Sequence, residues 1–143
     1  MKYLLVSLIL TLSALSVSAR ENFHLHPDFE PKIGYSGGVR VGNTLYISGT
    51  TGSGSTMAEQ IKSTYEKIEL VLKHYKTDFS HVVKETVFVT DMEALIKSSE
   101  VRRAFFGTKP NTNYPASSWI GVERLYHPSL MIEIELIVQL DDK

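Results

Sequence analysis

The sequence contains no cysteine and no marked excess of charge of either sign. Without cysteine the chain can form no disulfide, thiolate nucleophile or zinc–cysteine site. It carries 15 Lys and Arg against 16 Asp and Glu, a formal net charge of −1, so no basic field favours nucleic acid or a membrane surface. The length of 143 residues, 43% of them apolar and 22% charged, predicts one globular domain.

A long apolar run is also missing. One lysine near the N-terminus is followed by a mostly apolar stretch over residues 3–12, shorter than the roughly 20 residues that span a bilayer. The small residues Val-Ser-Ala at 17–19 fit a cleavage site. We therefore predict that residues 1–19 are a signal peptide, and that the protein is exported, to a periplasm or the exterior, without stable membrane association after cleavage. Residues 20–32 should form a polar, irregular arm, and residues 33–143 the folded domain.

The first half of the domain predicts a β-hairpin followed by a helix. Apolar residues flank a two-residue turn at Gly42-Asn43. Thr56 and Glu59 form a capping-box pattern at the start of a helix of about five turns. Its apolar positions recur every three or four residues: Met57, Ile61, Tyr65, Ile68, Leu72 and Tyr75.

The second half predicts a strand, a helix and a final pair of strands. Residues 81–90 are rich in β-branched side chains. Asp91 caps the second helix and Gly107 ends it. Residues 113–140 resemble two strands joined by a tight loop. The order ββαβαββ predicts an α+β domain, with a mixed sheet and two helices on one face. The uncovered face includes apolar residues, which favours contact with another subunit.

Several motifs that could carry chemistry are incomplete. The glycine-rich stretch before the first helix lacks the Gly-Lys-Ser/Thr of a phosphate loop. His24 and His26 lie two residues apart without an evident third ligand, so a solvated arm is favoured over a metal site. Ser117 has no neighbouring His-Asp pair for a nucleophilic triad. The sequence therefore predicts no metal and no cofactor.

Two carboxylates lie inside the most apolar strand. Glu133 and Glu135 are two residues apart and point to one face. Buried carboxylates are costly unless they are paired. One interpretation is an interface salt bridge, with Arg40 or Arg124 as the partner. The other is the wall of a pocket at a subunit boundary. The opposite face of the strand should pack under the helices: Ile132, Ile134 and Leu136.

Four blocks in order resemble the Rid family, the reactive intermediate deaminases, also called YjgF-like or endoribonuclease L-PSP proteins. They read GYSGGVRVGNTLYISGT, HVVKETVFVTDMEAL, YPASSWIGVERL and LMIEIELIV, and the resemblance covers about residues 33–140. It implies a chorismate-mutase-like fold and a homotrimer with three clefts between subunits. Typical members hydrolyse reactive enamines and imines, such as 2-aminoacrylate, to keto acids and ammonia.

The resemblance places five of the family's site positions on this chain, and four of them hold the family's residue. Tyr35 matches the tyrosine of the early block, and Ser48 and Gly49 match a Ser-Gly that ends the second strand. Glu133 matches the glutamate that positions the attacking water. Ser99 stands where the family usually has an asparagine in its second helix.

The arginine that grips the substrate carboxylate is absent. Typical members read Pro-Ala-Arg-Ser, whereas residues 115–118 here read Pro-Ala-Ser-Ser, so Ser117 replaces the arginine. Trp119 replaces a small residue two positions on. Arg124 falls on the opposite face of the strand from Ser117, and only a bulge at Gly121 would move it to the same face. A hydroxyl offers one neutral donor instead of a charged fork, so carboxylate substrates should bind roughly tenfold to a hundredfold more weakly, or worse.

Two functions from different classes follow. The first is an exported, trimeric binding protein for a small neutral, aromatic or cationic ligand that contacts Trp119 and Glu133, without ordinary imine deamination. The alternative is a deaminase or related hydrolase in which Glu133 orients water. Nuclease activity, suggested by an old family label, is disfavoured because no basic patch is present.

Overall fold

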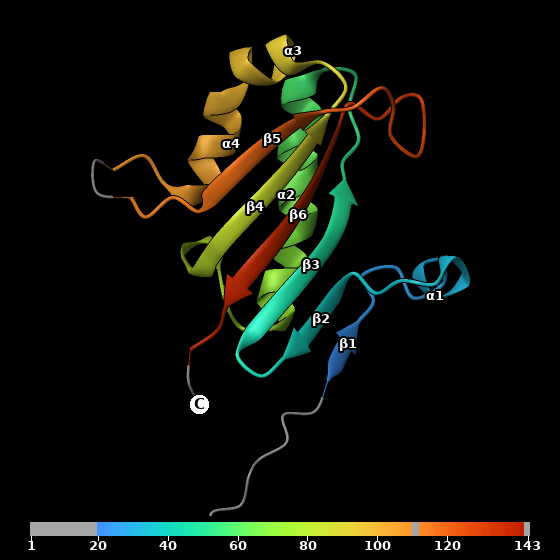
Figure 1. The fold of residues 1–143 in the computed structure, drawn as a ribbon, viewed down its shortest axis with the longest axis vertical. Helices are drawn as coiled ribbons and strands as arrows, with labels where there is room; N and C mark the ends of the chain where they lie inside the picture. Colours follow the sequence, from blue (N-terminus) through green and yellow to red (C-terminus); the bar gives the residue numbers. More distant parts are fainter. Residues whose placement is uncertain (1–19, 110–111, 142–143) are drawn as a thin grey trace, which may run out of the picture.

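A six-stranded mixed sheet forms the framework of the computed structural model, which describes residues 20–109 and 112–141 (Figure 1). The predicted signal peptide lies outside these residues. Across the sheet the strands are β1 (Glu21–Phe23), β2 (Gly38–Val41), β3 (Thr44–Thr51), β6 (Ile132–Gln139), β4 (Val82–Val89) and β5 (Ala116–Gly121). The neighbouring pairs are antiparallel, except that β4 and β5 run parallel. The predicted α+β class and mixed sheet are confirmed.

The longer helices cover one face of the sheet (Figure 1). They are α2 (Met57–His74), α3 (Met92–Lys97) and α4 (Ser99–Phe106), and a short α1 (Glu30–Ile33) lies apart from them. The predicted capping box is present, because the Thr56 hydroxyl accepts from the Glu59 amide and the Glu59 carboxylate accepts from the Thr56 amide. The single helix predicted after residue 91 is interrupted at Ser98, which is the C-cap of α3 and the N-cap of α4. Within the described ranges no helix is long and apolar enough to cross a membrane.

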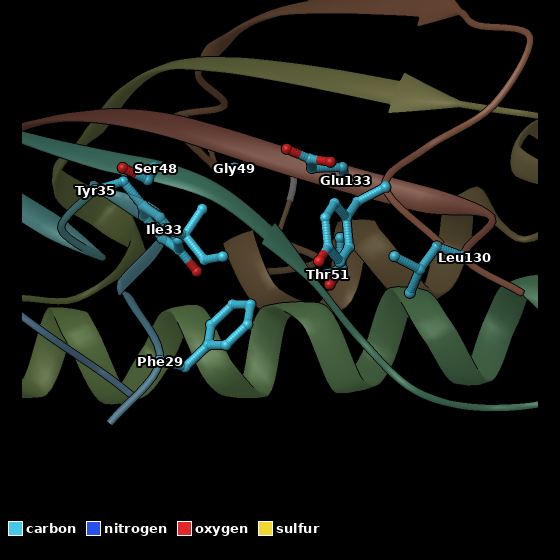
Figure 2. Close-up of a pocket in the computed structure, with 9 residues that line it drawn as sticks. Phe29, Ile33, Tyr35, Ser48, Gly49, Thr51, Leu130 and Glu133 are labelled. Carbon is cyan, nitrogen blue, oxygen red and sulfur yellow. The ribbon is translucent and has the colours of Figure 1, made fainter. Parts of the chain in front are cut away.

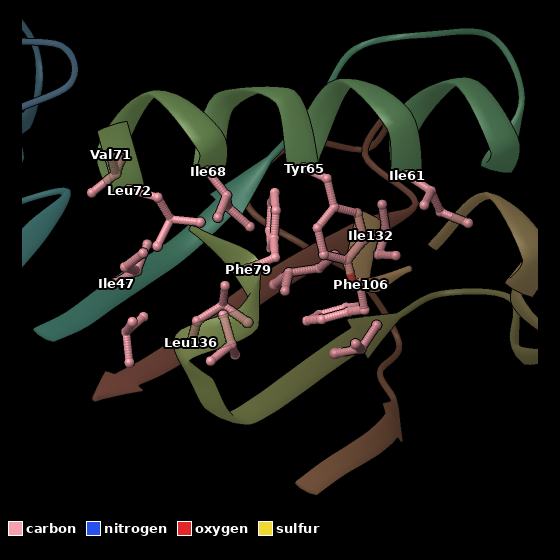
Figure 3. Packing of buried hydrophobic residues seen from close by; sticks show 14 of the residues in the cluster. Ile47, Ile61, Tyr65, Ile68, Val71, Leu72, Phe79, Phe106, Ile132 and Leu136 are labelled. Carbon is pink, nitrogen blue, oxygen red and sulfur yellow. The ribbon is translucent and has the colours of Figure 1, made fainter. Parts of the chain in front are cut away.

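The core lies between α2 and the sheet (Figure 3). Ile132, Ile134 and Leu136 of β6 are at most 2% exposed, as their alternation with the glutamates predicted. They pack with apolar side chains of α2, including Ile61, Ile68 and Leu72. Each such side chain contributes about 1.5–3 kcal/mol when it is fully buried. This packing fixes the opposite face of β6, with both carboxylates, on the side away from the helices.

The prediction that residues 113–140 form a hairpin is wrong. β5 and β6 do not pair, because β4 lies between them and pairs with both. The connection over residues 122–131 is long enough to carry the chain past β4, so β5 becomes the edge strand. Parallel β4 and β5 are joined through α3 and α4, which is the crossover that a parallel pair requires.

The prediction of an irregular, solvated arm over residues 20–32 is also wrong in part. β1 pairs with β2 and extends the sheet. Glu30, which is 1% exposed, accepts hydrogen bonds from the backbone amides of His26 and Gly37 at 2.9 and 2.8 Å. The Nδ1 atom of His24 lies 3.2 Å from the same carboxylate. A buried acceptor with three polar neighbours ties the arm to the domain, which local composition did not indicate.

Candidate functional site

A cavity of about 340 Å³ opens between the α1 segment, β3 and the connection that leads into β6. Figure 2 shows Phe29, Ile33 and Tyr35 on one side of it and Leu130 on the other. The side chains that line it are Phe29, Ile33, Tyr35, Ser48, Gly49, Thr51, Tyr126, Leu130 and Glu133. Four residues that the sequence singled out therefore meet here: Tyr35, Ser48, Gly49 and Glu133.

Gly49 makes room for the Glu133 carboxylate. The pairing of β3 with β6 shifts register between Ile47 and Thr50, and Gly49 lies within this irregularity. A Cβ atom at Gly49 would overlap the Glu133 carboxylate. Thr51, two residues on, is the cross-strand partner of Glu133. A glycine at this irregularity lets the Glu133 carboxylate approach the backbone closely, which explains physically why glycine follows Ser48 here.

Ser48 holds the segment that carries Tyr35. Its Oγ donates to the carbonyl oxygen of Ser36 at 2.7 Å, and its amide donates to that of Gly37 at 3.1 Å. The hydroxyl hydrogen of Ser48 is therefore already engaged, and the residue positions Tyr35 at the cavity rather than offering a free donor.

The electrostatics of the cavity are set by one unpaired carboxylate. Glu133 is half-buried, and no residue in the described part of the chain donates a hydrogen bond to it or forms an ion pair with it. Burial and the nearby Glu135 carboxylate raise the pKa of Glu133. Burial, with Glu30 and Glu133, raises the pKa of the Tyr35 phenol. Above the pKa of Glu133, the cavity thus holds a negative charge beside a neutral phenol.

Neither arginine that the sequence offered as a partner neutralises this charge. Arg40 donates from Nε to the carbonyl oxygen of Gly42 at 2.9 Å and lies 3.9 Å from Glu21. Arg124 is exposed and lines an adjoining hollow of about 390 Å³ that also includes Glu133. Among described residues, no ion pair within 4.0 Å joins Arg124 to Glu133. An intrachain salt bridge with either arginine is therefore absent at this site, and both a salt bridge across a subunit interface and a pocket wall stay predictions.

Ser117 and Trp119 lie on the other face of the sheet. In the ladder of β4 and β5, Ser117 is paired with Glu85 and Trp119 with Val87. Glu85 and Val87 are both 0% exposed and face the helices, whereas Glu133 faces away from them. One chain does not bring Ser117 and Trp119 to the cavity at Glu133, so a site built from both faces needs a second copy.

The Ser117 hydroxyl belongs to a buried polar cluster around Glu85. The Glu85 carboxylate accepts from Arg102 Nε at 2.8 Å, from Ser117 Oγ at 2.6 Å and from the Tyr65 hydroxyl. The indole N–H of Trp119 donates to Ser117 Oγ at 3.0 Å. The single hydroxyl hydrogen of Ser117 is thus donated to Glu85, and the single N–H of the Trp119 side chain is donated to Ser117.

No motif in the sequence indicated this cluster. Glu85 interrupts the apolar face of a β-branched strand, which was a signal that a partner had to exist. Arg102 supplies that partner from α4, with its guanidinium 4.9 Å from the Phe106 ring centroid and 5.8 Å from that of Trp119. Burial opposes the charge of Arg102, but hydrogen bonding and attraction to Glu85 outweigh it and raise the pKa of Arg102.

Ser99 is the remaining predicted site residue. It begins α4, is half-buried, and does not line the cavity at Glu133. The described residues also contain no group of three or more His, Asp or Glu side chains placed to hold a metal ion.

Comparison with known proteins gives consistent similarities. Residues 27–140 match the family model described as Endoribonuclease L-PSP. The human 2-iminobutanoate/2-iminopropanoate deaminase is 33% identical over 111 residues, covering 72% of this chain and 77% of that protein. A RutC family protein of Buchnera aphidicola is 30% identical over 108 residues, covering 71% and 83%. The crystal structure of a YjgF/YER057c/UK114 family member from Mycobacterium tuberculosis superposes with a TM-score of 0.76 and 31% identity, covering 85% of this chain and 100% of that one.

Proposed function

The chain belongs to the Rid family, also called YjgF-like or endoribonuclease L-PSP proteins, and on this basis we propose that it is an exported homotrimer that binds a small molecule in clefts between its subunits. It does so without deaminating 2-aminoacrylate at the rate of a typical member. The opposite faces of Glu133 and of Ser117 support the assembly, because a cleft that uses both requires two copies. The edge position of β5 leaves Ser117 accessible to a neighbouring subunit.

The observation that carries this proposal is that Ser117 has no charged group and already donates its hydroxyl hydrogen to Glu85. A substrate carboxylate needs a charged fork, whose two hydrogen bonds contribute about 1.5–3 kcal/mol each. Ser117 offers no fork, and its hydrogen is already donated to Glu85 at 2.6 Å. The neighbouring charge of Arg102 is paired with the same carboxylate. Among the described residues, an imino acid would therefore find no unpaired cation on the Ser117 face of this strand, because the Lys84 ammonium, which donates to Ser118 Oγ at 2.7 Å, lies on the opposite face.

What remains favours a neutral, aromatic or cationic ligand. The indole N–H of Trp119 is already donated to Ser117, so Trp119 offers a ligand only the face of its ring. Glu133 is unpaired among the described residues and would repel a carboxylate. The predicted export also favours a ligand other than the family's known imines, because those imines arise in cytoplasmic metabolism.

The test couples an imine-generating enzyme to keto-acid release. We expect the wild-type protein to show no family-like rate. Ser117→Arg should recover little, because the new guanidinium would meet Glu85 beside Arg102 and Trp119 still fills the adjacent space. Ser117→Arg with Trp119→Ala should recover more, and Ser117→Ala is the matched control. Each variant is checked for the assembly state of the wild type. Robust turnover by the wild-type protein would overturn the proposal.

A hydrolase is the second candidate, and one observation favours it. The Glu133 carboxylate faces a cavity with its pKa raised, which suits a group that orients and deprotonates water. Hydrolysis of an imine or amide that is abolished by Glu133→Gln, with the assembly intact, would establish it. Retention of such hydrolysis in that variant would exclude the role of Glu133.

A further inference from the structure

Three aromatic side chains are exposed around the Glu133 carboxylate. Phe29, Tyr35 and Tyr126 line the same cavity and are 45, 36 and 74% exposed. Figure 2 shows Phe29 and Tyr35 on the side of the α1 segment, whereas Glu133 comes from β6. Aromatic surface that one chain leaves exposed beside a hollow is available to a ligand or to the neighbouring subunit of the proposed trimer.

Among the described residues, no cationic side chain lines this cavity itself. Lys67 lines a neighbouring hollow, where its ammonium donates to the carbonyl oxygen of Thr51 at 2.8 Å. Arg124 lines the adjoining hollow, and in the part of the chain that the structure describes it forms no ion pair with Glu133. Glu135, on the same strand, is negative as well. Tyr35 and Tyr126 bring no positive charge to the cavity. A ligand that brings a positive charge would therefore meet attraction from Glu133 and no competing cation inside the cavity.

The aromatic rings and the Glu133 carboxylate together specify the class of cation. Aromatic faces attract cations through the negative charge of their π systems, most effectively where the cation is weakly hydrated. A hard metal ion would need several oxygen ligands, which one carboxylate and two phenols do not supply. The cavity of about 340 Å³ is at the small end for ligand pockets. An ammonium ion with small apolar substituents matches both the rings and the carboxylate.

We propose that this cavity binds an organic ammonium ion, with its positive nitrogen against Glu133 and its apolar substituents against Phe29, Tyr35 and Tyr126. This inference rests on the proposed function for the identity of the site and adds the class of the ligand. It assigns Tyr126, which no sequence motif singled out, as a residue that determines specificity.

Choline and its uncharged analogue 3,3-dimethylbutan-1-ol give the sharpest test, because they share a shape and differ in charge. Calorimetric titration of the purified protein should show choline binding at least about tenfold more tightly than the alcohol. Glu133→Gln should weaken choline roughly tenfold and leave the alcohol unchanged. Tyr126→Leu, which keeps apolar surface but removes the ring, should weaken choline about two- to tenfold.

The matched control is Glu135→Gln. It removes the same charge from the same strand, at an exposed position that does not line the cavity, so choline affinity should change little. Equal affinity for choline and the alcohol would overturn the inference, as would no binding of either or full affinity in Glu133→Gln. Tighter binding of glycine betaine than of choline would replace it with a zwitterion site that uses Arg124. None of these results affects the deaminase assay, which tests the proposed function separately.

Discussion

Arg102→Met should destabilise the protein strongly although it keeps a side chain of similar length. Arg102 is 11% exposed, and its guanidinium lies 4.9 Å from the Phe106 ring centroid and 5.8 Å from that of Trp119, so methionine also removes these cation–π contacts. The substitution removes the cation that faces Glu85, whose side chain is 0% exposed. The carboxylate would then keep only the hydroxyl donors of Tyr65 and Ser117.

The expected cost is about 3 kcal/mol. Removing one partner of a buried ion pair costs about 3–5 kcal/mol, because it leaves a charge without compensation. The two remaining hydroxyl donors place this case near the lower end. In Glu85→Leu with Arg102→Met both charges are gone, and the main loss is the acceptor for two hydroxyls, about 1–2 kcal/mol. The double variant should therefore be more stable than Arg102→Met alone.

Urea denaturation followed by fluorescence of the single tryptophan, Trp119, would measure both effects. All variants must be compared at one protein concentration, because assembly contributes to apparent stability. A cost below about 1 kcal/mol for Arg102→Met would refute a buried, charged pair. So would a double variant as unstable as the sum of the two single variants, because charges that do not interact give additive effects.

The remaining predictions concern the cavity, the assembly and the N-terminus. Gly49→Ala should displace the Glu133 carboxylate and weaken choline binding by about tenfold, with an unchanged mass in light scattering; unchanged affinity would contradict the close packing. Because burial and Glu135 raise the pKa of Glu133, choline affinity should rise with pH through that pKa and then level off, whereas Glu133→Gln should show no such rise in calorimetry. Light scattering of a dilute sample should give the mass of three chains; a stable monomer would refute the cleft. Mass spectrometry of the exported protein should find Arg20 at the N-terminus, and an intact residue 1 in the membrane fraction would refute the signal peptide.

Local patterns determined much of the fold from the sequence alone. The capping box at Thr56 fixed the start of α2, and the spacing of its apolar residues fixed the side that packs on the sheet. The two-residue period of β6 separated Ile132 and Ile134 from Glu133 before any neighbour was known. These features depend on residues a few positions apart, so the sequence states them directly.

Only the tertiary structure decided which strands are neighbours and which charges meet. β4 lies between β5 and β6, so Ser117 of β5 donates to Glu85 of β4 on the face that the helices cover. The two residues are far apart in the sequence. The partnership of Glu85 with Arg102 depends on α4 packing against that face. The cavity at Glu133 likewise needs the arm, β3 and a distant connection to converge, as the lining by Phe29 and Tyr126 shows. Such contacts are chosen by the packing of the whole chain, because burying a charge is tolerated only where a partner from elsewhere arrives to pair with it.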